Sequence, residues 1–161
     1  MPSGRVHLKI EAGLLFGWTA LAGFLLASRV ISVEGVIAFV LAYAFSALFL
    51  SPDLDLARSR AFRRWGLARW LWIPYALLFR HRRLSHHPIL GFVTRLAYLG
   101  AMIVVVGAVA VVVIGRPVRV GVPSAEALLA TAVGAYLPNL THVLVDRVVS
   151  GWRRRFAKRR L

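Results

Sequence analysis

Imidazole and carboxylate side chains of this sequence stand where they could hold a metal ion. His7 lies near the N-terminus, Asp53 and Asp55 share the string SPDLD, and His142 precedes Asp146 by four positions. The chain has no cysteine, so an ion would have to be bound through nitrogen and oxygen atoms alone. Such a ligand set suits zinc first, with manganese or iron as alternatives.

The string HRRLSHH contains three more histidines within seven residues. His81 and His86 are candidate ligands, whereas Ser85 or His87 could cap a helix that starts near Pro88. Two or three imidazoles from this string, added to the carboxylates of SPDLD, would complete a nitrogen and oxygen site.

Each of these features has a plainer interpretation when it is taken alone. His142 and Asp146 share one face of a helix, where they could bind one ion, or two neighbouring ions, or only form an interfacial hydrogen bond. Asp53 and Asp55 by themselves fit a capping turn, because Ser51 and Asp53 are good N-cap residues. The metal hypothesis depends on the features occurring together.

Long apolar stretches predict the helices that must position these candidate ligands. The hydrophobic fraction is 59%, above the roughly 45–50% of soluble domains, and about 20 apolar residues suffice for a helix to cross a bilayer. We therefore predict an all-α fold, a single integral membrane bundle over residues 1–161 with about four transmembrane helices. The predicted spans cover residues 12–27, 33–50, 89–114 and 127–149.

The basic residues predict how the bundle is oriented. Of the 21 Lys and Arg residues, the N-terminus has two, the 56–83 segment eight and the C-terminal region seven, whereas the other two links have one and two. By the positive-inside rule, both termini and the 56–83 segment are cytoplasmic in a protein of the plasma (inner) membrane. All five histidines then lie at the cytoplasmic end of the bundle.

The segment 56–83, between the second and third helices, alternates Arg with Trp. Trp65, Trp70 and Trp72 suit the headgroup level, and the arginines could bind anionic lipid headgroups, so we predict an interfacial segment. The run 70–79 could instead dip inward as a shallow re-entrant bend at Pro74. Nucleic-acid binding through the basic tail, residues 150–161, is a less specific alternative to lipid contact.

The chain resembles a family of small integral-membrane metal-binding proteins related to the membrane-bound metal-dependent hydrolases. The matching strings are MPSGRVH, SPDLD, RRWG with WIPY, HRRLSH followed by P-x-x-G, and H-x-x-x-D. They occur in this order over nearly the whole chain. The resemblance implies seven metal ligands, in agreement with the residue-based grouping: His7, Asp53, Asp55, His81, His86, His142 and Asp146.

One position departs from the family pattern. An acidic residue often follows the first histidine, and Leu8 stands there in this chain. Glu11, one helical turn after His7, could compensate, although pairing with Lys9 or Arg5 is the simpler expectation.

These features predict a metal-dependent hydrolase that acts on a phosphate ester or a lipid-linked substrate at the cytoplasmic membrane face. One or two divalent ions would activate water, and Arg82 and Arg83, with Arg95, could neutralise charge on a phosphate. Arg82 and Arg83 could equally hold headgroups only. The alternative function is a non-catalytic metal that stabilises the helix bundle.

The predicted orientation can be tested with topology reporters. A reporter fused after Leu161 should be cytoplasmic, and one inserted near Val122 should be on the opposite side, because basic segments resist translocation. A C-terminal reporter on the external side would contradict the orientation and the grouping of the ligands.

Overall fold

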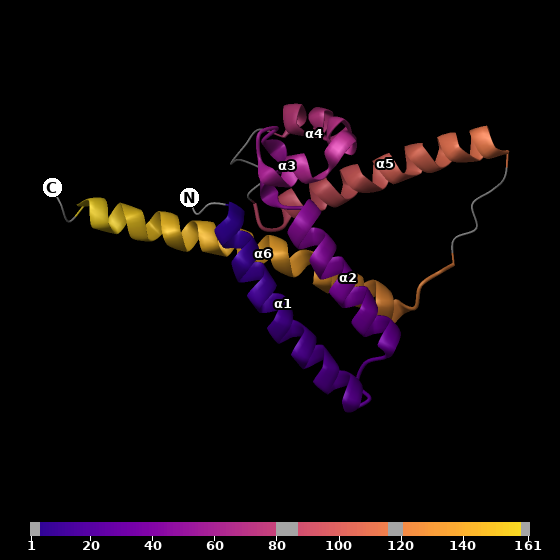
Figure 1. The fold of residues 1–161 in the computed structure, drawn as a ribbon, viewed down its shortest axis with the longest axis horizontal. Helices are drawn as coiled ribbons and strands as arrows, with labels where there is room; N and C mark the ends of the chain where they lie inside the picture. The colour runs from indigo at the N-terminus through magenta and orange to yellow at the C-terminus, as the bar shows by residue number, and fades with distance from the viewer. Residues whose placement is uncertain (1–3, 80–86, 116–120, 159–161) are drawn as a thin grey trace.

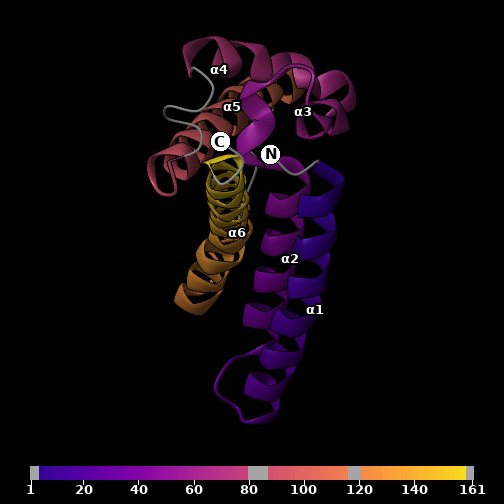
Figure 2. The ribbon, with the colours of Figure 1, turned by 90° about the vertical axis from the view of Figure 1, so that its left-hand side faces the viewer.

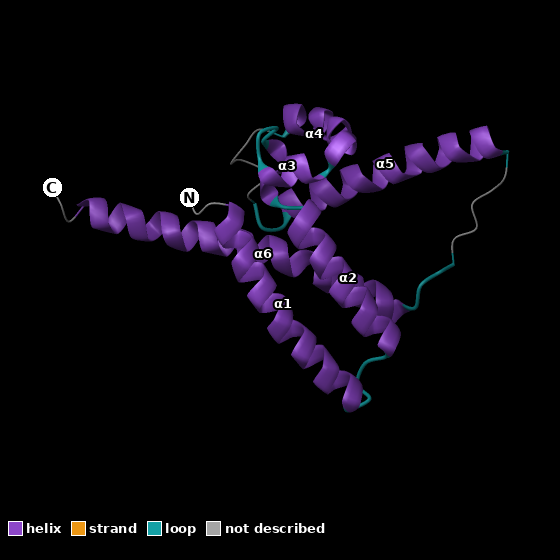
Figure 3. Cartoon of the chain, in the orientation of Figure 1, coloured by secondary structure: helices purple, strands orange, loops and turns teal. Residues whose placement is uncertain are grey.

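In the described part of the chain, helices are joined by loops and turns, and no strand is present (Figures 1 and 3). The computed structural model describes residues 4–79, 87–115 and 121–158, with side chains described for 6–79, 87–115 and 121–152. The helices, with η for a 3-10 helix, are α1 (Gly4–Ala27), α2 (Val33–Phe49), η1 (Pro52–Asp55), α3 (Arg60–Arg64), η2 (Gly66–Trp72), α4 (Ile73–Leu78), α5 (Leu90–Ile114) and α6 (Ala125–Lys158).

Four of these helices, α1, α2, α5 and α6, are long and apolar enough to cross a membrane. The predicted all-α class and the four spans are confirmed in this sense. α1 begins before its predicted apolar stretch and α6 ends after its own, because the helical backbone continues into polar residues at these two ends. His7 lies in the added turns of α1, whereas Asp146 falls within the predicted span 127–149, so both are on regular helix faces.

α1 and α2 form an antiparallel hairpin that runs beside α6 (Figure 2). At its turn, Ser32 caps α2 by accepting a hydrogen bond from the Gly35 amide, and Ser32 donates to Glu126 Oε1 at the start of α6. Ser124 donates in the other direction to Glu34. Glu34 and Glu126 thus join the two links at the end of the bundle far from the histidines, in line with their exclusion as ligands.

Close backbone packing joins α2 to α6. A Cβ at Gly134 would lie 2.5 Å from the Phe39 carbonyl oxygen, so only glycine permits this approach. About two turns after Phe39 in α2, Ser46 donates a 2.6 Å hydrogen bond to the carbonyl of Ala135, the residue after Gly134. The Ser46 hydroxyl and the absence of a side chain at Gly134 therefore fix the axial position of α6 relative to α2.

The segment from η1 to α4, residues 52–78, folds into a small helical cap over one end of the bundle (Figure 1). Its interior is a cluster of buried apolar and aromatic side chains, and Tyr98, Leu99 and Met102 of α5 pack against it. The Trp65 indole donates to the Phe49 carbonyl, which ties the cap to the end of α2. The buried cluster consists of Leu50, Leu54, Ala61, Phe62, Trp72 and Tyr75.

The three tryptophans expected at the headgroups differ in their surroundings. Trp70 is exposed, Trp65 is half-buried, and Trp72 is fully enclosed in the cluster of the cap. Trp72 therefore packs against protein and not against lipid. Sequence spacing could not reveal this, because burial depends on how η2 and α4 fold back on η1.

The tight α2–α6 contact leads to a stability prediction. Gly134→Ala should lower the free energy of unfolding by about 1–3 kcal/mol, because the Phe39 backbone cannot give way to the added methyl. Thermal or denaturant unfolding in detergent would measure this change. The matched variant Gly107→Ala, in an open stretch of α5, should be neutral or stabilising by up to about 1 kcal/mol. Equal effects of the two variants would contradict the packing.

Candidate metal centre

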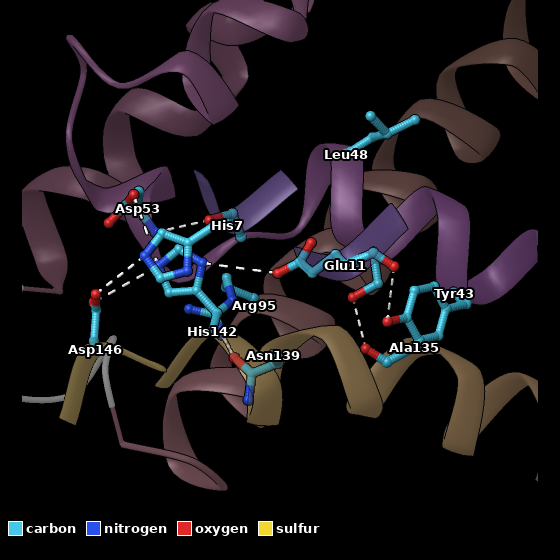
Figure 4. Close-up of polar contacts among 12 residues, drawn as sticks. His7, Glu11, Tyr43, Leu48, Asp53, Arg95, Ala135, Asn139, His142 and Asp146 are labelled. Carbon is cyan, nitrogen blue, oxygen red and sulfur yellow. Dashed lines mark hydrogen bonds and ion pairs between the residues drawn. The ribbon is translucent and has the colours of Figure 1, made fainter. Parts of the chain in front are cut away.

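Two helices far apart in sequence each present a histidine and an acid one turn apart. α1 supplies His7 and Glu11, and α6 supplies His142 and Asp146, each pair at positions i and i+4. Side chains at this spacing share a helix face. Figure 4 shows the two imidazoles side by side, with carboxylates around them.

A direct polar contact between the two histidine-bearing helices joins α1 to α6. His7 Nε2 lies 3.1 Å from Asp146 Oδ1. The His7 and His142 rings are stacked, with centroids 3.9 Å apart and planes inclined by 13°. The first and last long helices of the bundle therefore meet through polar groups at this point.

Both ring nitrogens of His142 face carboxylates. Nδ1 lies 3.9 Å from Glu11 Oε1, and Nε2 lies 3.8 Å from Asp53 Oδ2 and 3.8 Å from Asp146 Oδ2. These separations exceed the usual 2.7–3.2 Å of a hydrogen bond. They are short enough for the carboxylates to act on an imidazole or on an ion bound beside it.

The group is almost completely removed from the surface. Glu11 is 4% exposed, His142 3%, His7 5% and Asp146 7%. Burial of a charge is costly unless a partner of opposite charge or a metal compensates it. Several carboxylates around two imidazoles are thus a high-cost arrangement, which a cation would stabilise.

The geometry fits one divalent ion. His7, His142 and Asp146 offer donor atoms that all lie within 4.8 Å of one another. Two donors at about 2.0–2.2 Å from a common ion are at most about 4.4 Å apart, so small side-chain rotations would suffice. In addition, His7 Nδ1 is buried with no hydrogen-bond partner among the described residues.

SPDLD brings a further carboxylate to this group and a second one to a neighbouring network. Ser51 caps η1 by accepting from the Asp53 amide, and the turn directs Asp53 toward His142. Asp55, in the same turn, is buried and interacts electrostatically with Arg95 and Tyr75. The two aspartates thus have different surroundings.

Arg95 of α5 connects this turn to α6. It is fully buried, donates to the Asn139 side chain, and its charge also acts on Asp53. Asn139 in turn donates to the Pro88 carbonyl at the start of α5. Arg95 therefore interacts electrostatically with the carboxylates of η1 while it is bound to α6, and full burial removes it from contact with a soluble phosphate.

The seven predicted ligands fall into three groups. The structure brings together His7, His142 and Asp146, with Asp53 beside His142, whereas the described contacts of Asp55 lead to Arg95 and Tyr75. His81 and His86, and the predicted catalytic residues Arg82 and Arg83, lie outside the described residues. His87 accepts hydrogen bonds from the amides of residues 89 and 90, so it caps α5.

Glu11 is the residue that sequence reasoning undervalued. A local pair with Lys9 or Arg5 was the simpler expectation, but its carboxylate faces His142, which is more than 130 positions away in the chain. The signal that could have found it is the repeated spacing, because His7 and Glu11 mirror His142 and Asp146.

A comparison with protein families independently indicates metal binding. Residues 2–156 match the family described as Uncharacterized metal-binding protein (DUF2227). The chain belongs to this family. The expected kinship with a metal-binding family is therefore correct, and the His7, His142 and Asp146 group is the possible site for the ion in this DUF2227 protein.

A relative in Aquifex aeolicus, described as an uncharacterized protein, is 43% identical over 63 residues. The match covers 39% of this chain and 45% of the relative, so this chain spans less than half of that protein. No solved structure matches the chain.

Loss of a ligand should reduce metal binding by this DUF2227 protein. His142→Gln and Asp146→Asn keep side-chain size but remove the imidazole or the charge. Metal affinity should fall by more than the roughly 10–100-fold that follows loss of a residue that only orients a ligand. Elemental analysis of detergent-purified protein and chelator competition would measure this.

A matched control for these variants is His87→Gln, because His87 is exposed and caps α5. It should keep the wild-type metal content. Full metal content in both ligand variants would contradict the assigned centre.

Proposed function

We propose that this chain is a membrane-bound, metal-dependent hydrolase that cleaves a phosphate ester or lipid-linked substrate at the cytoplasmic membrane face. The observation that carries the proposal is the position of the buried histidine and carboxylate group next to a cleft of ≈ 240 Å³. The cleft is lined by His7, Glu11, Asp53 and His142, among others. The resemblance to the membrane-bound metal-dependent hydrolases and the distribution of basic residues support the reaction class and the orientation.

The ion would be held by His7, His142 and Asp146, with Asp53 as the nearest additional carboxylate. Nitrogen and oxygen donors without thiolate suit zinc first, and manganese or iron as alternatives. When bound, the ion supplies Lewis-acid polarisation of a phosphoryl or carbonyl oxygen and makes water a better nucleophile near neutral pH. His81 and His86 would add ligands if a second ion is bound.

Glu11 is the proposed general base. Its carboxylate lines the cleft, next to the ligand group but outside the set of three donors that converge on one point. A carboxylate there can take the proton from the attacking water, a role that typically contributes 10²–10⁴-fold to the rate. His142 Nδ1 lies 3.9 Å from Glu11 Oε1, so the proposed base stands directly beside the ligand group.

The cap and the basic residues near it would hold the enzyme against anionic headgroups. Arg69 lies over the exposed Trp70 ring at 5.0 Å, which keeps a guanidinium and an interfacial aromatic together. Arg82 and Arg83, which adjoin the cap in sequence, retain their proposed role toward substrate phosphate.

A non-catalytic metal is the second candidate, favoured by the position of the site between the first and last long helices. An ion there would link α1 to α6 and stabilise the bundle, as structural metals do. In that case metal would raise the unfolding temperature, and no substrate would turn over. The cleft beside the site favours catalysis, because a purely structural site needs no access.

Hydrolysis is testable in the purified, metal-loaded protein. Phosphate release from an aryl phosphate and from phosphatidic acid should require zinc or manganese and stop with a chelator. Glu11→Gln should lower kcat by about 10²–10⁴-fold while metal content stays normal, because only the proton acceptor is lost.

The control variant Glu34→Gln changes an acid at the far end of α2 and should keep full activity. The enzyme assignment would be overturned if metal-loaded wild-type protein showed no chelator-sensitive turnover. Wild-type kcat in Glu11→Gln would overturn the assignment of Glu11 as base.

A further inference from the structure

Two arginines line the same cleft as the histidines. The cap contributes Arg60 and Arg64 of α3 and Asp53 of η1 to the lining, and the long helices contribute His7, Glu11 and His142. The two arginines stand at positions i and i+4, so they share the face of α3 that borders the cleft. The lining of the cleft thus includes both cationic side chains and residues of a possible metal site.

The position of α3 is fixed by packing and by hydrogen bonds. Ser59 caps the helix by accepting from the Phe62 amide at 3.1 Å, and Ala61 and Phe62 are buried in the cluster of the cap. Arg64 donates to the Leu48 carbonyl at 3.1 Å, which anchors its guanidinium at the end of α2. Arg64 is half-buried and Arg60 exposed, so one donor group is held firmly and the other can adjust.

Charge balance in the cleft favours an anionic ligand. Like charges at i and i+4 repel each other, and an anion bound between them would replace this repulsion with attraction. With one divalent ion present, four positive charges would face the carboxylates of Glu11, Asp53 and Asp146. The surplus positive charge lies on the side of the cleft that contains Arg60 and Arg64.

We propose that the cleft binds a phosphoryl group, with Arg60 and Arg64 holding its oxygens near the metal ligands. This inference deepens the proposed function and rests on it for the metal. Guanidinium groups bind phosphate oxygens in bidentate fashion through charge-assisted hydrogen bonds. A volume of ≈ 240 Å³ far exceeds the ~10–15 Å³ needed by one water, so a polyatomic anion fits.

The surroundings allow the phosphoryl group to belong to a lipid or to a soluble molecule. Leu8, Leu56 and Ala61 add apolar surface to the cleft, and Leu67 and Leu77 on the cap are strongly exposed. Such exposed apolar side chains suit the membrane interface, where lipid phosphates lie. Free phosphate and a lipid phosphate monoester share the chemistry that the arginines recognise.

Binding of inorganic phosphate to the full chain in phosphatidylcholine nanodiscs, loaded with zinc, tests the site without any turnover. Arg60→Gln and Arg64→Gln should each weaken phosphate affinity about tenfold or more, because a charge-assisted contact is lost. Arg63→Gln is the matched control, since Arg63 lies on the same helix but does not line the cleft, and it should bind as wild type does.

Because Arg64 also anchors α3, Arg64→Lys provides a second variant that keeps the charge but loses the bidentate fork. It should bind phosphate with an affinity between those of wild type and Arg64→Gln. Metal content and unfolding temperature would verify that every variant is folded. Wild-type phosphate affinity in both glutamine variants, or no phosphate binding by the wild type, would overturn the inference.

Lipid competition identifies the source of the phosphoryl group. Nanodiscs with phosphatidic acid should displace phosphate if a lipid monoester is the ligand, and those with phosphatidylglycerol control for surface charge. Competition by neither lipid would assign a soluble phosphate. Phosphate binding without any hydrolysis would overturn the proposed enzyme activity but support the phosphoryl site. Hydrolysis together with normal phosphate affinity in the arginine variants would support the enzyme activity but overturn the phosphoryl site.

Discussion

The contact between His7 and Asp146, together with the stacked His142 ring, is the constraint on which the polar half of this structure depends. It places imidazoles and carboxylates together in the buried interior, where uncompensated charge is expensive. The surroundings compensate at each side, since Glu11 and Asp53 face the two nitrogens of His142. Because the buried carboxylates need compensating positive charge, a bound divalent cation would stabilise this group.

A second layer of buried polar groups keeps these residues in place. Pro138 cannot donate a backbone hydrogen bond, and directly after it Asn139 joins Arg95 to the start of α5. The charge of Arg95 acts on both aspartates of η1. Burial also raises the pKa of the Tyr75 phenol, which stays neutral beside this network and contacts Thr94. The turn that contains Asp53 is thus held from α5 and from the cap.

Much of this arrangement could be predicted from the sequence, for physical reasons. Apolar runs of membrane-spanning length define the four long helices, and helical periodicity puts His142 and Asp146 on one face. Contacts between distant segments are less accessible, because Glu11 meets His142 only through the α1–α6 crossing, and Trp72 is buried only by the fold of the cap. The number of basic residues in the segment 56–83 predicted that its arginines contact lipid headgroups, but Arg60 and Arg64 line the cleft.

The distribution of burial explains how so small a chain can reserve its interior for polar groups. Much of α5 exposes valine and isoleucine side chains, including Val104, Val112 and Ile114, which would be a liability in water. In a bilayer the surrounding lipid is as apolar as these side chains, so they need no protein partner. The protein contacts are instead concentrated where glycine and serine bring α2 to α6, and where histidine, aspartate and arginine meet under the cap. The polar groups are therefore gathered at one end of the bundle, beside a cleft, where burial strengthens the electrostatic interactions between them.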